Sequence, residues 1–156
     1  MPPSEKREEL QVVARNKRAR YDYSVEETLE AGLELLGSEV KGLRSGAANL
    51  SDAYAIPRGT ELYLLNTRIG PYSHTASFSH EPTRSRRLLL HRSEINRWTA
   101  KVRERGYSII PLMLYFKRGR AKVQLGLCRG KTHEDRRADI KEREARREME
   151  RVLRRQ

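Results

Sequence analysis

Features that define several large classes of protein are missing from this sequence. Its 156 residues include one cysteine, Cys128, so no disulfide can form within the chain, as is typical of a reducing compartment. No run reaches the roughly 18 apolar residues that a membrane-spanning helix needs. The charged N-terminus, MPPSEKREEL, lacks the apolar core of a signal peptide. We therefore expect a cytoplasmic protein without a membrane-spanning segment.

Motifs of catalysis and metal binding are equally scarce. The sequence has no Walker phosphate-binding loop, no GxSxG nucleophile motif and no GxGxxG dinucleotide motif. Its four histidines, at positions 74, 80, 91 and 133, have no metal-ligand spacing among themselves or with Cys128. We therefore predict that the protein is not an enzyme and that it has no catalytic residue, no metal site and no cofactor.

Positive charge is what the sequence has in excess. It contains 33 Lys and Arg residues against 21 Asp and Glu residues, which gives a net charge of +12. Residues 1–129 carry 23 basic and 14 acidic residues, and residues 130–156 carry 10 and 7, so the excess is spread along the chain. Such charge favours a polyanionic partner, with nucleic acid as the first candidate. A membrane surface is the second candidate, and a merely solubilising surface is the third.

Apolar residues that alternate with polar ones predict a mainly β protein. We expect strands over residues 21–36, 49–56, 61–69, 107–116 and 121–128, the first with a bulge near Ala31 and Gly32. A turn over Lys117 to Arg120 joins the last two strands, and Pro111 places the fourth at an edge or a bulge. Short turns favour antiparallel pairing. The fold class that fits is a small antiparallel OB-like Greek-key barrel with about three short helices.

Two helices are indicated within this barrel. One covers Ser38 to Arg44, with Ser38 as its cap. The other lies in the region 84–106, where Ser93 is the cap, residues 95, 98 and 102 face inward, and Gly106 ends the helix. Residues 88–90 form a turn before it, and residues 70–83 read as a long loop. In the strand 121–128, the even-numbered residues, Cys128 among them, are expected to face solvent.

Composition divides the chain into three parts. Residues 1–15 form a flexible N-terminal arm, residues 16–129 the barrel, and residues 130–156 a basic C-terminal tail. Seventeen of the 27 tail residues are charged, so the tail has too few apolar side chains to offset the entropy of ordering it. Pairs at a spacing of four, such as Glu142 and Arg146, still favour helix. We therefore expect the tail to be disordered or conditionally helical.

Basic and polar residues from four separate segments form the candidate nucleic-acid surface. They lie beside tyrosines, around a glycine turn, before a helix and on the polar side of a strand, and these positions suit phosphate contact and base stacking. Scattered basic residues of this kind indicate a structured RNA. The residues predicted to bind RNA on this basis are Asn16, Lys17, Arg18, Arg20, Tyr21, Lys41, Arg44, Asn49, Arg84, Arg86 and Lys122.

Longer motifs make the prediction more specific. The stretches are NKRARYDY (Asn16 to Tyr23), LEAGLELLGSEVKGLRSGAANLSDAYA (Leu29 to Ala55), EPTRSRRLLLHRSEI (Glu81 to Ile95), RGYSIIPLMLYFKRGRAKVQLGLCRGK (Arg105 to Lys131) and DIKERE (Asp139 to Glu144). In this order they resemble the small protein B family, the bacterial proteins that bind transfer-messenger RNA (SsrA RNA). The resemblance extends over residues 16–144.

The resemblance implies a fold, a function and partners. It implies an oligonucleotide-binding-type barrel that binds the tRNA-like domain of transfer-messenger RNA. The protein would deliver that RNA to stalled bacterial ribosomes for trans-translation, which rescues the ribosome and tags the unfinished product. The implied partners are transfer-messenger RNA, the stalled 70S ribosome with its 16S rRNA, and elongation factor Tu indirectly through the charged RNA. No membrane partner is implied.

The resemblance also assigns roles to residues. It maps RNA binding onto Glu30, Leu89 and Lys122, with Asn16, Lys17, Arg18 and Arg20 as phosphate contacts. The tail is implied to enter the empty mRNA path as a helix, with His133 placed to stack on a ribosomal base. The other ribosome-binding tail residues are Gly130, Lys131, Asp135, Arg136, Arg137, Ile140, Lys141 and Arg143. Thr132, Glu134 and Ala145 depart from the family's pattern in this part of the chain.

Two other functions stay open as alternatives. An RNA-processing or RNA-modifying enzyme on the same barrel would need a carboxylate or metal cluster, together with turnover of RNA. A structural ribosomal protein would sediment in stoichiometric amounts with all ribosomes rather than with stalled ones.

Overall fold

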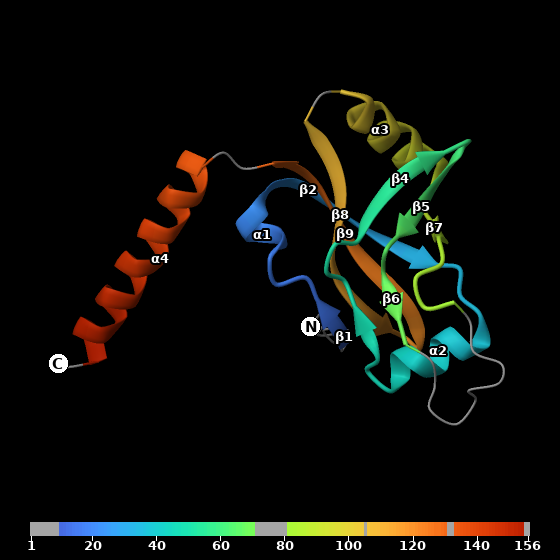
Figure 1. The fold of residues 1–156 in the computed structure, drawn as a ribbon, viewed down its shortest axis with the longest axis horizontal. Coiled ribbons are helices and arrows are strands. Elements are labelled where there is room, and N and C mark those ends of the chain that lie inside the picture. Colours follow the sequence, from blue (N-terminus) through green and yellow to red (C-terminus); the bar gives the residue numbers. More distant parts are fainter. Residues whose placement is uncertain (1–9, 71–80, 105, 131–132, 155–156) are drawn as a thin grey trace, which may run out of the picture.

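A β barrel makes up most of the structure, and one long helix projects from it (Figure 1). The structure, a computed structural model, describes residues 10–70, 81–104, 106–130 and 133–154. Two short strands, β3 (Ala48–Asn49) and β6 (Arg68–Ile69), pair with each other. The main sheet consists of β1 (Gln11–Arg15), β2 (Tyr23–Leu33), β4 (Tyr54–Arg58), β5 (Glu61–Leu65), β7 (Arg86–Leu89), β8 (Tyr107–Lys117) and β9 (Arg120–Gly130).

The main sheet is antiparallel throughout and closes on itself. Its strand order is β1-β8-β4-β5-β7-β2-β9, and β8 also pairs with β9 along its whole length. This second pairing turns the sheet into a barrel, which leaves few unpaired edges. Three short helices accompany it: α1 (Ala19–Asp22), α2 (Gly37–Arg44) and α3 (Arg92–Arg103). The predicted mainly β, OB-like barrel is confirmed.

Side chains that alternate along the strands fill the barrel. Leu62 and Leu64 of β5 and Val123 and Leu125 of β9 are completely buried in one apolar cluster. Successive strand residues point to opposite faces, so a spacing of two places each pair on the same side. Trp98 of α3 is buried in the same cluster, so its side chain packs this helix against the barrel.

β8 has two different neighbours along one edge. Ile109 in its first half meets β4, whereas Met113 to Phe116 in its second half pair with β1. Pro111 lies between these contacts and has no N–H to donate to a neighbouring strand. The register with β9 shifts between Pro111 and Met113. Of the two positions predicted for Pro111, the bulge is correct and the sheet edge is not.

The segment before residue 16 is not wholly a flexible arm. Residues 11–15 form β1, because pairing with β8 satisfies their backbone groups. The chain then turns into α1 and covers the outer side of β8 and β9. A second apolar cluster results, made of Ala19, Ile110, Leu112 and Cys128. Cys128 is therefore completely buried rather than exposed as predicted.

Several strand boundaries differ from the predicted ones. The bulge of β2 lies between Val25 and Glu27 instead of near residues 31 and 32. The predicted strands 49–56 and 61–69 are each divided in two, at Asp52 and Asn66, which have positive φ angles of 63° and 59°. Residues 86–89 form β7, between β5 and β2, where the sequence predicted a helical region and a turn. A short, continuously apolar run has no periodicity that distinguishes a strand from a helix.

The helices α2 and α3 use glutamates at their N-termini. Each begins one residue before the serine that was predicted as its cap, Ser38 or Ser93. The carboxylates of Glu39 and Glu94 accept hydrogen bonds from the backbone N–H three residues earlier, at 2.8 and 3.0 Å. This contact satisfies a donor that the helix itself leaves unpaired. The predicted helices are confirmed and their predicted caps are wrong.

The C-terminal tail forms α4 (His133–Arg154), a helix of 22 residues that stands away from the barrel (Figure 1). It contacts the barrel region at α1. All its described side chains, from Arg137 to Arg154, are exposed. The predicted pair at a spacing of four is present, with Arg146 Nη2 donating to Glu142 Oε1 at 2.7 Å. Of the two states that the sequence left open, the structure has the helical one.

Candidate nucleic-acid interface

One open groove contains three of the residues that the family resemblance assigned to RNA binding. Glu30 comes from β2, Leu89 from β7 and Lys122 from β9, and all three line a groove of about 510 Å³. We name it the Glu30 groove. Its lining also includes Gly32 of β2, as well as Arg87 and Arg92 on either side of the β7–α3 connection. Adjacent strands thus bring together residues that are far apart in the sequence.

Strand register explains how the Glu30 groove forms. Gly32 lies opposite Lys122 on one side and opposite Leu89 on the other. A Cβ atom on Gly32 would lie 3.1 Å from Cβ of Leu89, so the glycine leaves the space that Leu89 occupies. Leu89 is 45% exposed and offers the groove an apolar surface. A base and a phosphate can therefore contact Leu89 and Lys122 side by side.

The carboxylate of Glu30 is bound by two side chains of β8. Tyr115 Oη donates to Glu30 Oε2 at 2.5 Å, and Lys117 Nζ lies 3.4 Å from both carboxylate oxygens. Desolvation favours the neutral acid, but the bond from Tyr115 and the charges of Lys117 and Lys122 outweigh it and lower the pKa of Glu30 below 4.5. Burial and the bond to Glu30 raise the pKa of Tyr115. At neutral pH, Glu30 is thus an acceptor and Tyr115 a donor.

Tyr115 and Lys117 were absent from the predicted site residues. The signal for Tyr115 was nevertheless present in the sequence. A two-residue turn at Arg118 and Gly119 pairs Lys117 with Arg120, and counting back along this hairpin places Tyr115 opposite Lys122. Positive φ angles of 51° and 76° at the two turn residues are those of such a hairpin.

Arginines on the rim of the Glu30 groove already have carboxylate partners. Arg87 Nε donates to Glu34 at 2.6 Å, and Arg92 Nη2 lies 3.2 Å from Glu61. Their side chains stay 41% and 57% exposed. Ion pairs in contact with water contribute little, so an RNA phosphate can compete for these guanidinium groups. Arg87 belongs to the basic cluster that the sequence places before α3, whereas Arg92 was absent from the predicted site residues.

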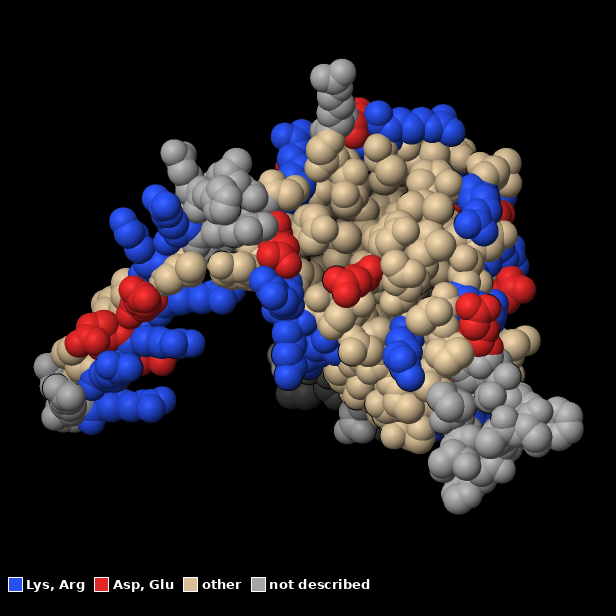
Figure 2. All heavy atoms as spheres, in the orientation of Figure 1, with Lys and Arg blue, Asp and Glu red and all other residues tan. Residues whose placement is uncertain are grey.

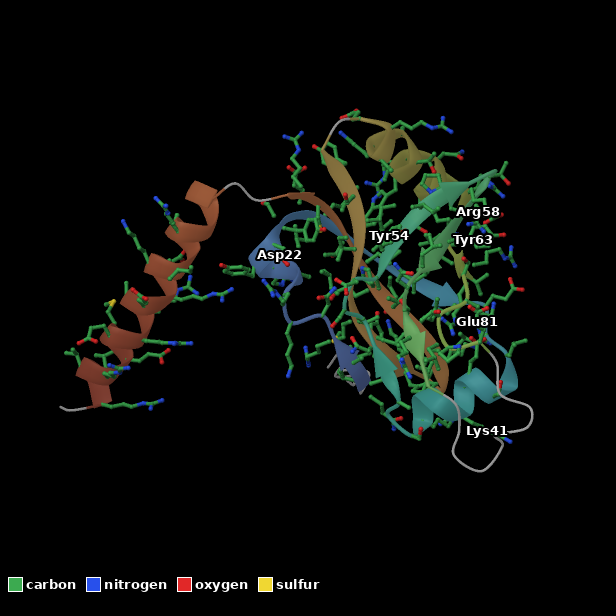
Figure 3. All side chains as sticks on the ribbon, in the orientation of Figure 1. Asp22, Lys41, Tyr54, Arg58, Tyr63 and Glu81 are labelled. Carbon is green, nitrogen blue, oxygen red and sulfur yellow. The ribbon has the colours of Figure 1, made fainter. Side chains whose placement is uncertain are left out.

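A second groove lies on the side of the barrel formed by the N-terminal segment. It measures about 1040 Å³ and lies between residues 13–19, the β3–β4 connection and the start of β8. We name it the N-terminal groove. The predicted residues Lys17 and Arg18 are exposed on it, and Asn49 lines it. Tyr54 lines it as well and is 40% exposed (Figure 3).

Asn16 anchors the chain beside the N-terminal groove. Its backbone N–H donates to the carbonyl of Leu112 at 2.9 Å, and its Nδ2 donates to the carbonyl of Pro111 at 3.0 Å. These bonds join the end of β1 to the bulge of β8. The amide of Asn16 is therefore used within the protein, and it holds in place the segment that presents Lys17 and Arg18.

The other predicted residues outside the tail are distributed over α1 and α2. Arg20 is exposed on α1, and Arg18 lies 5.7 Å from the ring centre of Tyr21. Lys41 and Arg44 are exposed on α2, and Arg44 lies 4.8 Å from the ring centre of Phe116. Figure 3 places Lys41 at the far end of the barrel from α1. The predicted RNA-binding residues thus occupy several surfaces rather than one.

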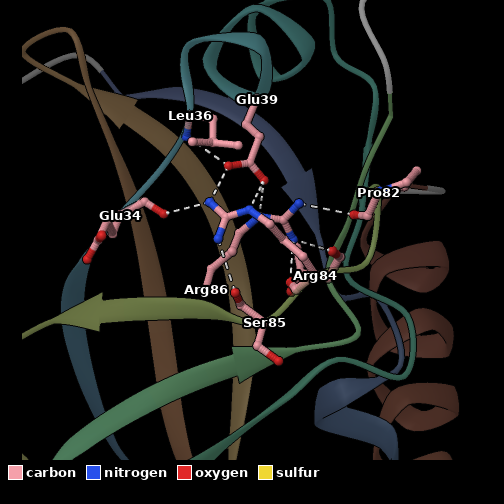
Figure 4. A network of polar contacts seen from close by, with 8 residues as sticks. Glu34, Leu36, Glu39, Pro82, Arg84, Ser85 and Arg86 are labelled. Atoms are coloured by element: carbon pink, nitrogen blue, oxygen red, sulfur yellow. Dashed lines mark hydrogen bonds and ion pairs between the residues drawn. The ribbon is translucent and has the colours of Figure 1, made fainter. Parts of the chain in front are cut away.

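Arg84 and Arg86 bind a carboxylate within the protein, and Arg86 is completely buried, contrary to its prediction as an RNA-binding residue, whereas Arg84 stays 29% exposed. Both donate to the carboxylate of Glu39, with Arg84 Nε at 3.0 Å and Arg86 Nε at 2.5 Å from Oε2 (Figure 4). Arg86 also donates to the carbonyls of Thr67 and Pro82, at 2.7 and 3.1 Å. The side chains of Arg86 and Glu39 are completely buried. A buried guanidinium with these partners cannot reach a phosphate.

This Glu39 network holds several segments together. Desolvation would raise the pKa of Glu39, but the hydrogen bonds from Arg84, from the backbone of Leu36 and from Arg86 prevail and lower it. The carboxylate is therefore charged at neutral pH, as its two arginine partners require. The network joins α2 to β7 and to the chain around Pro82, so its role is structural.

The predicted ribosome-binding residues lie at the end of β9 and along α4. Gly130 ends β9, and four of the residues are exposed on α4: Arg137, Ile140, Lys141 and Arg143. Lys131 and the side chains of His133, Asp135 and Arg136 lie outside the described residues. Figure 2 shows Lys and Arg side chains along α4, whereas the barrel face in the same view is mostly uncharged.

The described parts of the chain contain no group of three His, Cys, Asp or Glu side chains that could hold a metal ion. Nor does any described helix combine the length and apolar character needed to cross a bilayer. Burial raises the pKa of the Cys128 thiol to about 11, so this thiol stays protonated at neutral pH.

Comparison with known proteins gives the family. The SmpB protein family matches residues 13–155 of the sequence. The chain belongs to the SmpB protein family. The SsrA-binding protein of Myxococcus xanthus (strain DK1622) is 70% identical over 146 residues, which are 94% of this chain and 90% of that protein. That of Anaeromyxobacter sp. (strain K) is 62% identical over 142 residues, 91% of this chain and 87% of that protein.

A solved structure supports the same family and the fold. It is described as "tmRNA-SmpB: a journey to the center of the bacterial ribosome", and its matching chain is 43% identical to this one. The TM-score is 0.66, and the match covers 81% of this chain and 93% of that chain. The resemblance seen in the sequence motifs is thereby confirmed at the level of the SmpB family.

Proposed function

We propose that this protein binds the tRNA-like domain of transfer-messenger RNA and delivers it to stalled bacterial ribosomes for trans-translation. The observation that carries the proposal is the Glu30 groove, in which Glu30, Leu89 and Lys122 meet from three strands. Membership of the SmpB family and a 70% identical SsrA-binding protein support the same RNA. The excess of positive charge suits a polyanionic partner.

The barrel and the tail have separate tasks in this proposal. The barrel binds the RNA, and α4 occupies the empty mRNA path of the stalled 70S ribosome, against 16S rRNA. Exposed Arg137, Lys141 and Arg143 support this placement, because basic side chains on a helix suit a path lined by phosphates. Elongation factor Tu joins indirectly, through the charged RNA. The protein itself acts without catalysis, and we place it in the cytoplasm.

Filter binding with transfer-messenger RNA at several salt concentrations tests the role of the barrel. We expect the affinity to fall steeply as salt increases, because neutralised phosphates release counterions. We also expect the protein to prefer this RNA to an unrelated RNA of the same length. Equal binding of both RNAs, or an affinity that does not change with salt, would contradict the proposal.

Removal of residues 130–156 tests the division of tasks. The truncated protein keeps both grooves, so we expect it to bind transfer-messenger RNA as the full chain does. We expect it to fail in a tagging assay on ribosomes stalled at the end of a message without a stop codon. Loss of RNA binding in the truncated protein would refute the division.

A further inference from the structure

The Glu30 groove contains a carboxylate, although the proposed ligand is a polyanion. Glu30 lies among Lys122, Arg87 and Arg92, and its side chain is 37% exposed. A carboxylate repels phosphate, so electrostatic attraction to the RNA backbone cannot explain its position. Its place in the groove calls for a ligand group that donates hydrogen bonds.

The orientation of this carboxylate is set by β8. Tyr115 is only 4% exposed, and its Oη donates to Glu30 Oε2 at 2.5 Å. Lys117 Nζ stands 3.4 Å from both oxygens, so it approaches from one side of the carboxylate. A carboxylate has about four acceptor positions, and these two donors leave acceptor positions free on both oxygens. The free positions are available to a ligand that enters the groove.

An ionised carboxylate with a free acceptor position on each oxygen discriminates among bases. On its Watson–Crick edge, guanine alone presents two adjacent donors, N1–H and N2–H. Adenine and cytosine place an acceptor nitrogen beside their amino group, and uracil has one N–H between two carbonyls. Such edges are accessible in single-stranded loops, where proteins read RNA sequence. The exposed apolar surface of Leu89 and the charge of Lys122 suit the plane of such a base and its phosphate.

We propose that Glu30 binds the Watson–Crick edge of an unpaired guanine in the RNA partner, and that Tyr115 is the positioning residue that orients this carboxylate. The inference rests on the proposed function, since it names the group of the RNA that enters the Glu30 groove. It assigns Glu30 to sequence recognition, and it leaves phosphate contact to the basic residues around it.

Inosine substitution tests the guanine contact. Inosine lacks the 2-amino group of guanine, so each unpaired guanine of the tRNA-like domain is replaced by inosine in turn. At one position we expect binding to the wild-type protein to weaken by at least about tenfold, as for one hydrogen bond to a charged group. The same RNA should bind Glu30→Ala, which has no acceptor for the 2-amino group, no more weakly than the unmodified RNA does. If no position shows this difference, the inference is wrong; if neither protein binds any RNA, the proposed function fails instead.

Tyr115→Phe tests the positioning role through the pH dependence of RNA binding. Removing the hydroxyl takes a donor from the ionised form of Glu30, so its pKa rises. We expect RNA affinity to fall at a higher pH than in the wild type when the medium is acidified between about pH 7 and 3.5. The profile of Glu30→Gln should lack this step. The charged or titratable groups that face Glu30 are Tyr115, Lys117, Lys122, Glu61, Arg87, His91, Arg92 and Glu94.

Two further variants separate positioning from folding. Lys117→Met removes the second donor to Glu30, so it should shift the profile in the same direction as Tyr115→Phe. Tyr63→Phe removes a hydroxyl from β5, outside the groove, and should leave the profile unchanged. Thermal unfolding of each variant checks that it is folded. A profile of folded Tyr115→Phe that coincides with the wild type would overturn the positioning role.

Discussion

Glu30 and Glu39 are chemically identical residues with different tasks. Both carry a pKa that hydrogen-bond donors lower, and both are ionised at neutral pH. Glu39 is completely buried and each of its oxygens has partners, so its charge contributes to the fold alone. Glu30 is partly exposed and keeps free acceptor positions, so its charge is available to a ligand. Burial and the number of donors decide which task each one has.

Glu39→Gln should destabilise the fold strongly. The substitution leaves Arg84 and Arg86 without their carboxylate, and breaking a buried ion pair typically costs about 3–5 kcal/mol. Urea unfolding followed by fluorescence of Trp98, the one tryptophan of the chain, measures the loss. Glu142→Gln is the matched control, because its pair with Arg146 is exposed and contributes roughly 0.5 kcal/mol or less. Equal losses in both variants would contradict the structural role of the network.

Acid should remove the same stabilisation. Because the folded-state pKa of Glu39 lies below its ordinary value of 4.5, the network contributes fully above that pH. Its contribution is then lost as the pH falls through the lowered folded value. The difference in unfolding free energy between wild type and Glu39→Gln should therefore shrink below about pH 4.5. A difference that stays constant as the pH falls well below 4.5 would show that the charge of Glu39 is unimportant.

Two glycines of α2 should respond to alanine in opposite ways. A Cβ atom on Gly42 would lie 2.6 Å from the backbone oxygen of Gly70, so Gly42→Ala should destabilise by about 1–3 kcal/mol. Gly37 has no atom within 4 Å of such a Cβ. Gly37→Ala should stabilise by up to about 1 kcal/mol, because alanine favours helix. Thermal unfolding of the two variants compares them, and a stable Gly42→Ala would show that α2 can move away from β6.

Among the secondary-structure elements, β7 shows how strand alternation separates buried side chains from those that can contact a ligand. Along β7, Arg86 and Leu88 are buried, whereas Arg87 and Leu89 face outward. The alternation follows from strand geometry, so it would have been predictable if residues 86–89 had been recognised as a strand. The run 88–90 is continuously apolar, so it shows neither the period of a strand nor that of a helix. Because a helix follows it, these residues were predicted as a helical turn. This misassigned strand thus explains why the buried Arg86 was placed on the RNA surface.

α4 is an element whose stability should be independent of the barrel. Its described side chains are exposed and it contacts the rest at α1, so little apolar surface connects it to the barrel. Ala145→Pro should break the helix, at a local cost of about 3 kcal/mol, and lower the helical signal in circular dichroism.

Trp98, buried in the barrel, gives the second readout for this variant. Its fluorescence transition in urea should keep the wild-type midpoint in Ala145→Pro. Ala145→Gln is the control, because glutamine keeps the helix and should leave both signals unchanged. A lower midpoint in Ala145→Pro would mean that α4 and the barrel unfold as one unit.

At the scale of the whole molecule, the two grooves draw on different parts of one barrel. The Glu30 groove uses β2, β7 and β9, and the N-terminal groove uses β1, α1 and the start of β8. Their described lining residues do not overlap, yet α3 contributes Arg92 to the first and Val102 to the second. The protein therefore presents separate surfaces to a large ligand, which suits a structured RNA better than a small molecule.

The salt dependence of RNA affinity should distinguish basic residues that contact phosphates from basic residues that do not. Lys122→Gln removes a phosphate contact proposed for the Glu30 groove, so the slope of log affinity against log salt should fall by about one. Arg58→Gln removes a charge from β4, where Arg58 lies 5.1 Å from the ring centre of Tyr63 (Figure 3). That variant should keep the wild-type slope. Equal slopes for Lys122→Gln and the wild type would place the phosphates elsewhere.

Four properties can be read directly from the amino-acid sequence: the charge excess, the alternation that builds the barrel, the position of α3 and the motifs of the family. These properties are local, because period, turn residues and composition are read within a few residues. Which polar groups are buried, and which remain available to a ligand, depends on tertiary contacts. Arg86 meets Glu39 across 47 positions and Tyr115 meets Glu30 across 85, so no local pattern specifies either contact. Closure of the sheet into a barrel brings these residues together. The charges of Glu39 and Arg86 are fully desolvated and need each other as partners, whereas Glu30 stays partly in contact with solvent and can face a ligand.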